Sequence, residues 1–264
     1  MSNPAADTLR SQWAAGKVTF GAWLTTPSPV SAEAAARVGF DYVCVDTQHG
    51  ATDYQTAVYM IQAILLGGSR PIVRVPWNEP GVIGKMLDAG AIGVVVPMVN
   101  TAREAQAVVR ACRYPPLGER SFGPVMAGMR TPDYAVEANE RVAVIPMIET
   151  AEALSNLDDI LAVQGLDAIY VGPADLSLSL GLRPANNDGR PEFDAALDRI
   201  VAACRDAGVV PGIHASGALA LRRVERGFAM VTVANDLLAM RAAMTDELAE
   251  ARGVEKSGEN ARIY

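Results

Sequence analysis

The chain has 264 residues, half of them hydrophobic, and a formal net charge of −7 at pH 7. This length and hydrophobic content suffice for one large α/β core. The acidic balance argues against a nucleic-acid partner, and the scattered Lys and Arg residues form no polybasic run for a membrane surface.

The N-terminus shows no signal-peptide pattern, and no apolar run approaches the roughly 20 residues that a membrane helix needs. The three cysteines (Cys44, Cys112 and Cys204) lie far apart in apolar stretches, which favours buried free thiols over a metal cluster or disulfides. A cytoplasmic protein is therefore predicted.

Short β-branched runs alternate with helical patterns along the whole chain. Most are apolar almost throughout, as is typical of parallel strands covered on both faces. The predicted strands span residues 19–24, 41–46, 71–75, 92–98, 142–148, 166–171, 209–213 and 228–233. The helices between them have 3.6-residue spacing, and several open on Ser, Thr or Pro and close on Gly.

Eight strands, each followed by a helix, predict a (β/α)8 TIM barrel. We expect one domain over residues 1–264, with polar terminal segments at about 1–10 and 255–264. A doubly wound open sheet is the second possibility, but its GxGxxG motif after the first strand is missing.

Residues 113–140 do not fit this repeat, because they are about three times as long as a normal αβ connection. The segment follows a helix, so it leaves from the N-terminal end of the barrel. It is either a surface excursion or a contact with a neighbouring subunit. Its Arg113 and Arg120 are either exposed surface residues or recognise a distal substrate carboxylate across a subunit interface.

Barrel enzymes keep their chemistry at the C-terminal ends of the strands. In this chain those ends carry many polar side chains, and they include both histidines. The residues are Trp23, Asp46, Gln48, His49, Arg74, Glu149, Asp175, His214, Asn235 and Asp236.

Strands five and six each deliver one carboxylate, Glu149 and Asp175. Two hard oxygen ligands suit an octahedral Mg²⁺ or Mn²⁺ that keeps waters and substrate oxygens. Each acid could instead cap the helix that follows it. Their adjacency on the same rim as Arg74 favours the metal site.

Arg74 ends an apolar strand, where an unpaired guanidinium would be costly. It is either a structural ion pair or a positive group facing an enolate oxygen or a substrate carboxylate. Trp23 is either a pocket wall or core packing. His214 either lines the pocket mouth or is a satisfied histidine above the core.

Asp46 and His49 close the stretch DYVCVDTQHG. A carboxylate three residues before an imidazole could orient the ring and hold its tautomer, as a general base requires. The alternative is a loop histidine after an N-capping aspartate. The three lysines (Lys17, Lys85 and Lys256) do not end strands, which disfavours a Schiff-base aldolase.

An ordered set of motifs covers almost the whole chain: GAWL, FDYVCVDTQHG, PIVRVPWNEP, LDAGAIGVVVPMV, RYPPLGER and IYVGPADLSLSLG. In this order they resemble the HpcH/HpaI class II pyruvate aldolases, such as 4-hydroxy-2-oxoheptanedioate and 2-dehydro-3-deoxyglucarate aldolases. The resemblance implies a (β/α)8 barrel, commonly a homohexamer built as a trimer of dimers, with the last helix exchanged between paired subunits. It also implies a metal-dependent lyase of aromatic or sugar-acid catabolism.

The resemblance further implies reversible cleavage of a 4-hydroxy-2-oxo acid to pyruvate and an aldehyde, through a pyruvate enolate held on a divalent metal. Glu149 and Asp175 would bind Mg²⁺, Mn²⁺ or Co²⁺. Arg74 would stabilise the enolate oxygen, and His49, steadied by Asp46, would transfer protons through a water. Substrate-binding positions would be Trp23, Gly172, Pro173, Ala174, Asp175 and His214, with the pyruvate carboxylate on the backbone of residues 172–175.

This chain departs from the family pattern at three positions: Gln48 stands where many members carry Glu, Met147 where several carry Gln, and His214 where some carry an aliphatic residue. These departures bear on the acceptor aldehyde more than on the pyruvate half. Two other functions stay open from the sequence. One is a citrate-lyase-like enzyme acting on CoA thioesters, although no basic groove for the CoA phosphates is evident. The other is a barrel that binds an oxo acid without turning it over.

Overall fold

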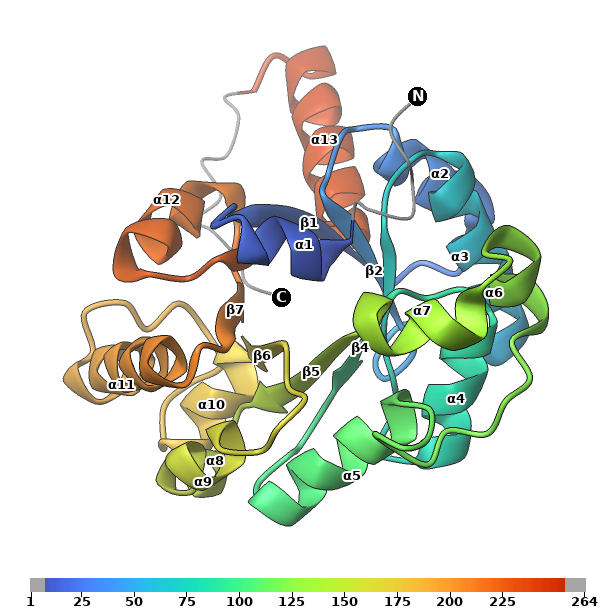
Figure 1. The fold of residues 1–264 in the computed structure, drawn as a ribbon. Coiled ribbons are helices and arrows are strands. Elements are labelled where there is room, and N and C mark those ends of the chain that lie inside the picture. The colour runs from blue at the N-terminus through green and yellow to red at the C-terminus, as the bar shows by residue number, and fades with distance from the viewer. Residues whose placement is uncertain (1–7, 255–264) are drawn as a thin grey trace.

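The computed structural model describes residues 8–254, which form a closed barrel of eight parallel strands in sequence order (Figure 1). The strands are β1 (Thr19–Leu24), β2 (Tyr42–Asp46), β3 (Pro71–Arg74), β4 (Gly93–Val96), β5 (Ala143–Ile148), β6 (Ala168–Val171), β7 (Val210–His214) and β8 (Met230–Asn235). The predicted barrel is confirmed, and every predicted strand is present.

Helices surround this barrel on the outside (Figure 1). In the described residues they are α1 (Leu9–Ala14), α2 (Pro29–Ala36), α3 (Tyr54–Leu66), α4 (Pro80–Asp88), α5 (Ala102–Cys112), α6 (Val125–Arg130), α7 (Tyr134–Arg141), α8 (Ala151–Ser155), α9 (Leu157–Leu161), α10 (Pro173–Ser179), α11 (Pro191–Ala207), α12 (Gly217–Arg226) and α13 (Asp236–Ala251).

Side chains alternate between two separate hydrophobic cores. In β2, Tyr42 and Cys44 belong to the cluster inside the barrel, whereas Val43 and Val45 belong to the larger cluster between strands and helices. This follows from the two-residue period of a strand. Both faces are therefore apolar, which explains why the strands read as continuous apolar runs. All three cysteines are buried and unpaired, as predicted.

Helix α1 closes the N-terminal end of the barrel. Its Leu9 and Trp13 join the interior cluster, and the Trp13 indole Nε1 donates to Thr19 Oγ1 at 3.0 Å. The predicted polar segment 1–10 is therefore too long, because Leu9 is fully buried in a helix. Residues 1–7 and 255–264, which include the rest of both predicted terminal segments, lie outside the described residues.

The 113–140 excursion contains α6 and α7, and α6 packs against α4 of its own barrel. The Arg120 guanidinium lies over the rings of Tyr114 and Tyr134, at 4.6 and 5.4 Å, and donates to Asp88 Oδ1 at 2.6 Å. Arg113 is likewise buried. The reading of Arg113 and Arg120 as exposed surface arginines is wrong.

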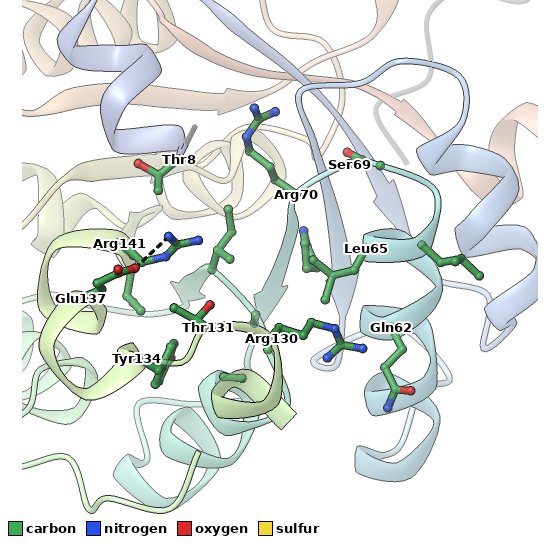
Figure 2. A pocket seen from close by; sticks show the side chains of 18 of the residues that line it. Thr8, Gln62, Leu65, Ser69, Arg70, Arg130, Thr131, Tyr134, Glu137 and Arg141 are labelled. Atoms are coloured by element: carbon green, nitrogen blue, oxygen red, sulfur yellow. Dashed lines mark hydrogen bonds and ion pairs between the residues drawn. The ribbon is translucent and has the colours of Figure 1, made fainter. Parts of the chain in front are cut away.

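A cavity of about 750 Å³ lies between this excursion and α3 (Figure 2). Arg70, Arg130 and Arg141 line it, and Arg141 pairs with Glu137 across 3.1 Å. The lining also includes the first residue of β3, so the cavity opens where strands begin. It is thus at the opposite end of the barrel from the predicted chemistry.

Helix α13 stands apart from the rest of the barrel wall (Figure 1). None of its residues is buried, although an apolar stripe at helical spacing runs along it. The stripe consists of Leu237, Met240, Met244 and Leu248, each at least 44% exposed. Within residues 8–254, every helix is too short or too polar to cross a membrane.

Candidate active site

The strand alternation directs one set of polar side chains into the C-terminal end of the barrel interior. Asp46 follows Tyr42 and Cys44 at even spacing, Arg74 follows Ile72, and Glu149 follows Ile145 and Met147. Asp46, Arg74, Glu149 and His214 are nearly fully buried in spite of their polarity. The barrel therefore directs these four of the predicted strand-end residues into its interior.

Arg74 and Asp46 form a buried ion pair between neighbouring strands. Arg74 Nε donates to Asp46 Oδ1 at 2.9 Å, and Nη2 donates to Oδ2. Trp23 completes this group, because its Nε1 donates to Asp46 Oδ2 at 3.2 Å and its ring lies 5.0 Å from the Arg74 Cζ. Such a two-pronged contact orients the guanidinium plane.

Asp46 also organises the loop that follows it. Its Oδ1 accepts from the backbone amides of Gln48 and His49, at 2.9 and 3.2 Å. Burial alone would raise the pKa of Asp46, but the hydrogen bonds and charge of Arg74, with these amides, hold it below its ordinary value. The hypothesis that Asp46 orients the His49 imidazole needs correction: its side-chain partner is Arg74, and it reaches His49 through the backbone.

His49 lies on the exposed rim. Residues that contact a substrate arriving from solvent are commonly found on such exposed loops.

Glu149 directly follows β5 and is 2% exposed. Burial raises its pKa to about 7, and the negative charge of Asp175 adds to this effect, whereas the Met98 amide and Arg74 oppose it. The Met98 amide donates to Glu149 Oε1 at 2.8 Å. Met98 has a φ of 56°, a left-handed conformation that is uncommon for a residue other than glycine and that clusters at functional sites.

Asp175 lies in the first turn of α10, which begins at Pro173 after Gly172. A Cβ atom at Gly172 would lie 2.4 Å from Glu149 Oε2, so only glycine lets this backbone approach the carboxylate. Pro173 is buried, whereas Ala174 and Asp175 are partly exposed. The segment is in contact with Glu149 and still accessible.

The pair Glu149 and Asp175 fits a hard divalent cation. The negative charge of Asp175 makes ionisation of Glu149 more costly, and one shared positive ion would relieve this repulsion. Within residues 8–254 no three His, Cys, Asp or Glu side chains are grouped as a complete ligand set. Waters and substrate oxygens would therefore supply the remaining ligands, as is usual for Mg²⁺.

His214 ends β7 inside the barrel, edge-on to Trp23 with ring centroids 5.4 Å apart. Burial, and secondly the charge of Arg74, lower the pKa of His214 to about 4, so the ring is neutral at pH 7. Asn235 caps α13, and Asp236 accepts from the amides of residues 25 and 26. These two strand-end residues are structural.

Sequence reasoning missed three interior residues beside this site, namely Tyr42, Tyr170 and Thr232. Each lies on an apolar strand at the same parity as a predicted site residue, and that parity was the available signal. It also missed the Met98 amide, for which the sequence carries no signal.

Comparisons with known proteins agree with this geometry. Residues 19–252 match the HpcH/HpaI aldolase/citrate lyase family. A hydroxypyruvate/pyruvate aldolase of Rhizorhabdus wittichii is 41% identical over 248 residues, 93% of this chain and 99% of that protein. A 4-hydroxy-2-oxo-heptane-1,7-dioate aldolase of Salmonella paratyphi C is 42% identical and covers 97% of each chain.

The crystal structure of an HpcH/HpaI aldolase/citrate lyase family protein from Burkholderia cenocepacia superposes with a TM-score of 0.86. It is 34% identical and covers 93% of this chain and 99% of its own. The family match over residues 19–252 spans the barrel strands and every predicted site residue. This chain belongs to the HpcH/HpaI aldolase/citrate lyase family, and it is a carbon–carbon lyase of the class II aldolase type.

Proposed function

We propose that the protein reversibly cleaves a 4-hydroxy-2-oxo acid into pyruvate and an aldehyde. The observation that carries this proposal is the buried Glu149 carboxylate, whose pKa is raised in part by the neighbouring charge of Asp175. A buried carboxylate beside a partly exposed one, with a fixed guanidinium nearby, suits a metal-assisted enolisation. The names of the relatives at 41 and 42% identity support the same reaction class.

Glu149 and Asp175 would hold Mg²⁺, Mn²⁺ or Co²⁺. When bound there, a divalent cation supplies Lewis acidity at the keto oxygen of the substrate. The backbone at the start of α10, from Gly172 to Asp175, would hold the pyruvate carboxylate, with the N–H groups of Gly172, Ala174 and Asp175 as donors because Pro173 has none. Gly172 makes this approach possible because any side chain there would collide with Glu149.

Arg74 would stabilise negative charge on the enolate oxygen. Its orientation is set in advance by Asp46 and Trp23, so little reorganisation accompanies charge formation. His49 would remove a proton from the reacting carbon of the substrate, and return it, through a bridging water. Its exposed position on the Asp46-anchored loop is compatible with that role.

Trp23 and His214 would line the pocket, and Gln48 with His214 would influence the acceptor aldehyde. The relatives are named for hydroxypyruvate and for a 4-hydroxy-2-oxo-heptanedioate. We therefore propose a small carboxylic acid with oxo and hydroxyl groups as the substrate class. Three buried, unpaired cysteines suit a reducing compartment such as the cytoplasm.

We also propose a homo-oligomer in which α13 packs on a partner subunit, with a hexamer as the assembly. The support is the apolar stripe on α13, where four large side chains are exposed within one chain. Light scattering after size exclusion tests this. Met244→Glu should produce smaller species, and an unchanged mass would count against α13 as the contact.

Incorporation of deuterium from D₂O into the pyruvate methyl group, followed by proton NMR, tests the reaction. The full chain with Mg²⁺ should exchange the methyl protons, and removal of metal with EDTA should stop the exchange until Mg²⁺ is restored. Cleavage of 4-hydroxy-2-oxo acids should show the same dependence. Exchange or cleavage that survives complete metal removal would overturn the proposal.

A further inference from the structure

A row of buried polar groups lies inside the barrel, and the proposed reaction uses only its last member, His214, as a pocket wall. Thr232 Oγ1 is at its centre, 2.9 Å from the Tyr42 hydroxyl and 2.6 Å from the Tyr170 hydroxyl. The Tyr170 hydroxyl is also 3.3 Å from His214 Nδ1. The four side chains come from β2, β6, β7 and β8, and all are nearly fully buried.

Two glycines provide the space for these tyrosine rings. Gly21 is the register partner of Tyr42, and a Cβ there would lie 2.1 Å from the tyrosine ring. Gly212 is the register partner of Tyr170, and a Cβ there would lie 3.0 Å from the Tyr170 ring and 2.8 Å from the Ile169 carbonyl oxygen. The interior is therefore shaped around both phenols.

The hydroxyl of Tyr170 determines the tautomer of His214. A phenol has one hydrogen, and Tyr170 donates it to Thr232 Oγ1. The contact with His214 then requires Nδ1 to carry the hydrogen and donate to the phenol oxygen. Burial lowers the pKa of His214, which agrees with a neutral ring. A neutral imidazole adds no second positive charge to compete with Arg74 for Asp46.

The ring of Tyr170 acts in a second way. It stacks on Trp23 with centroids 5.3 Å apart and an interplanar angle of 25°. Trp23 in turn donates to Asp46 and lies beneath the Arg74 guanidinium. A continuous set of contacts therefore runs from Tyr170 to the ion pair that orients Arg74.

We propose that Tyr170 is a positioning residue: its ring supports Trp23 against the Arg74–Asp46 pair, and its hydroxyl keeps His214 in the Nδ1–H tautomer. This rests on the proposed function, since the orientation of Arg74 matters for rate only if Arg74 faces the reacting oxygen. Tyr170 itself need not touch substrate.

Tyr170→Phe removes the hydroxyl and keeps the ring. Because the chain has only two histidines, the imidazole ¹⁵N spectrum of the full, histidine-labelled protein with Mg²⁺ contains two rings, and His49→Ala assigns them. Wild type should show His214 as Nδ1–H, and Tyr170→Phe should lose that preference. Because Tyr170→Phe keeps the ring, its kcat in pyruvate exchange should stay within about twofold of wild type. Tyr170→Leu removes the ring that supports Trp23, so kcat should fall about tenfold, because a small misplacement near the reacting atoms is costly, while KM changes less than about twofold.

Tyr42→Phe is the matched control, since it removes the other phenol hydroxyl on the same Thr232 oxygen without a hydrogen bond to His214. It should leave the His214 signal and kcat unchanged. Thr232→Val removes the acceptor of Tyr170, so the phenol hydrogen should turn to His214 Nδ1 and produce the Nε2–H tautomer.

A wild-type His214 in the Nε2–H form, equal spectra for Tyr170→Phe and Tyr42→Phe, or an unchanged kcat in Tyr170→Leu would overturn the proposal. The wild-type spectrum is recorded without turnover. It therefore decides the tautomer of His214 even if either variant loses stability. Failure of wild type to exchange pyruvate protons would instead refute the proposed function and leave the tautomer result standing.

Discussion

The two ends of the barrel both bury arginines, with very different surroundings. At the N-terminal end, Arg113 donates to Asp167 and to the Val142 and Gly165 carbonyls, and Arg120 is enclosed by Asp88 and two tyrosine rings. At the C-terminal end, Arg74 pairs with Asp46, and its charge also opposes the rise in the pKa of Glu149 that burial causes.

This difference shows that burial and ion pairing do not by themselves indicate a functional arginine. Arg113 and Arg120 fasten the 113–140 excursion to its own barrel, where their acids neutralise them. Arg74 acts electrostatically on two carboxylates, Asp46 and Glu149. Glu149 also lies beside Asp175, and protein groups alone do not neutralise that pair. Excess carboxylate charge beside the fixed Arg74 guanidinium therefore distinguishes the C-terminal end of the barrel from the N-terminal end.

The largest expected effect comes from removing one of these excess negative charges, the Glu149 carboxylate. Glu149→Gln keeps the shape but removes one of the two proposed metal ligands, so cleavage should fall by at least about 10³-fold, since metal ions supply several kcal/mol of transition-state stabilisation. Calorimetry should show weaker Mg²⁺ binding in the same variant. Asp88→Asn, at the other end, should leave Mg²⁺ affinity unchanged, and an equal loss there would remove the distinction between the two ends.

Paired substitutions of Arg74 and Arg120 compare the two ends directly. Arg74→Lys loses the two-pronged contact with Asp46, and kcat should fall about 10²-fold or more. Arg120→Lys should lower the thermal midpoint but leave kcat per folded molecule unchanged, because its partners are structural. A kcat loss in Arg120→Lys similar to that in Arg74→Lys would contradict the assignment.

His49→Ala should reduce pyruvate methyl exchange by about 10²-fold, the low end of general acid–base effects. Since the side chain is exposed, the free energy of unfolding should change by less than about 0.5 kcal/mol. Deuterium exchange and a denaturation curve on the same preparation check both parts. Full exchange activity in the variant would eliminate His49 as the proton-transfer group.

The smallest effect concerns pH. The folded-state pKa of His214 is lowered to about 4 from an ordinary 6.5, so the folded form resists protonation. This contribution to stability is complete above about pH 6.5 and declines as the pH falls toward 4, by about 2 kcal/mol at pH 5. Denaturation of wild type and His214→Gln at about pH 7.5 and 5 measures it. Equal pH dependence in both would show that His214 is not buried and neutral.

Much of the site could be predicted because strand patterns are local. Apolar runs gave the eight strands, and their ends gave Asp46, Arg74, Glu149 and His214. The two-residue period then places side chains of equal parity inside the barrel, so their convergence follows from closure alone. The motif after β6 likewise located Asp175 and the glycine next to Glu149.

Pairings across the barrel could not be read in this way. Arg74 is 28 residues from Asp46, and Tyr170 is 62 residues from Thr232, so the tertiary arrangement of the strands, their register and their closure into a barrel, decides which groups meet. It gave Asp46 to Arg74 instead of the nearby imidazole, and it buried Arg113 and Arg120. The sequence by itself determined the strand order and the parity of each side chain, because both are local; the tertiary structure decided the partner of each buried charge, because a desolvated charge takes the partner that packing brings within reach.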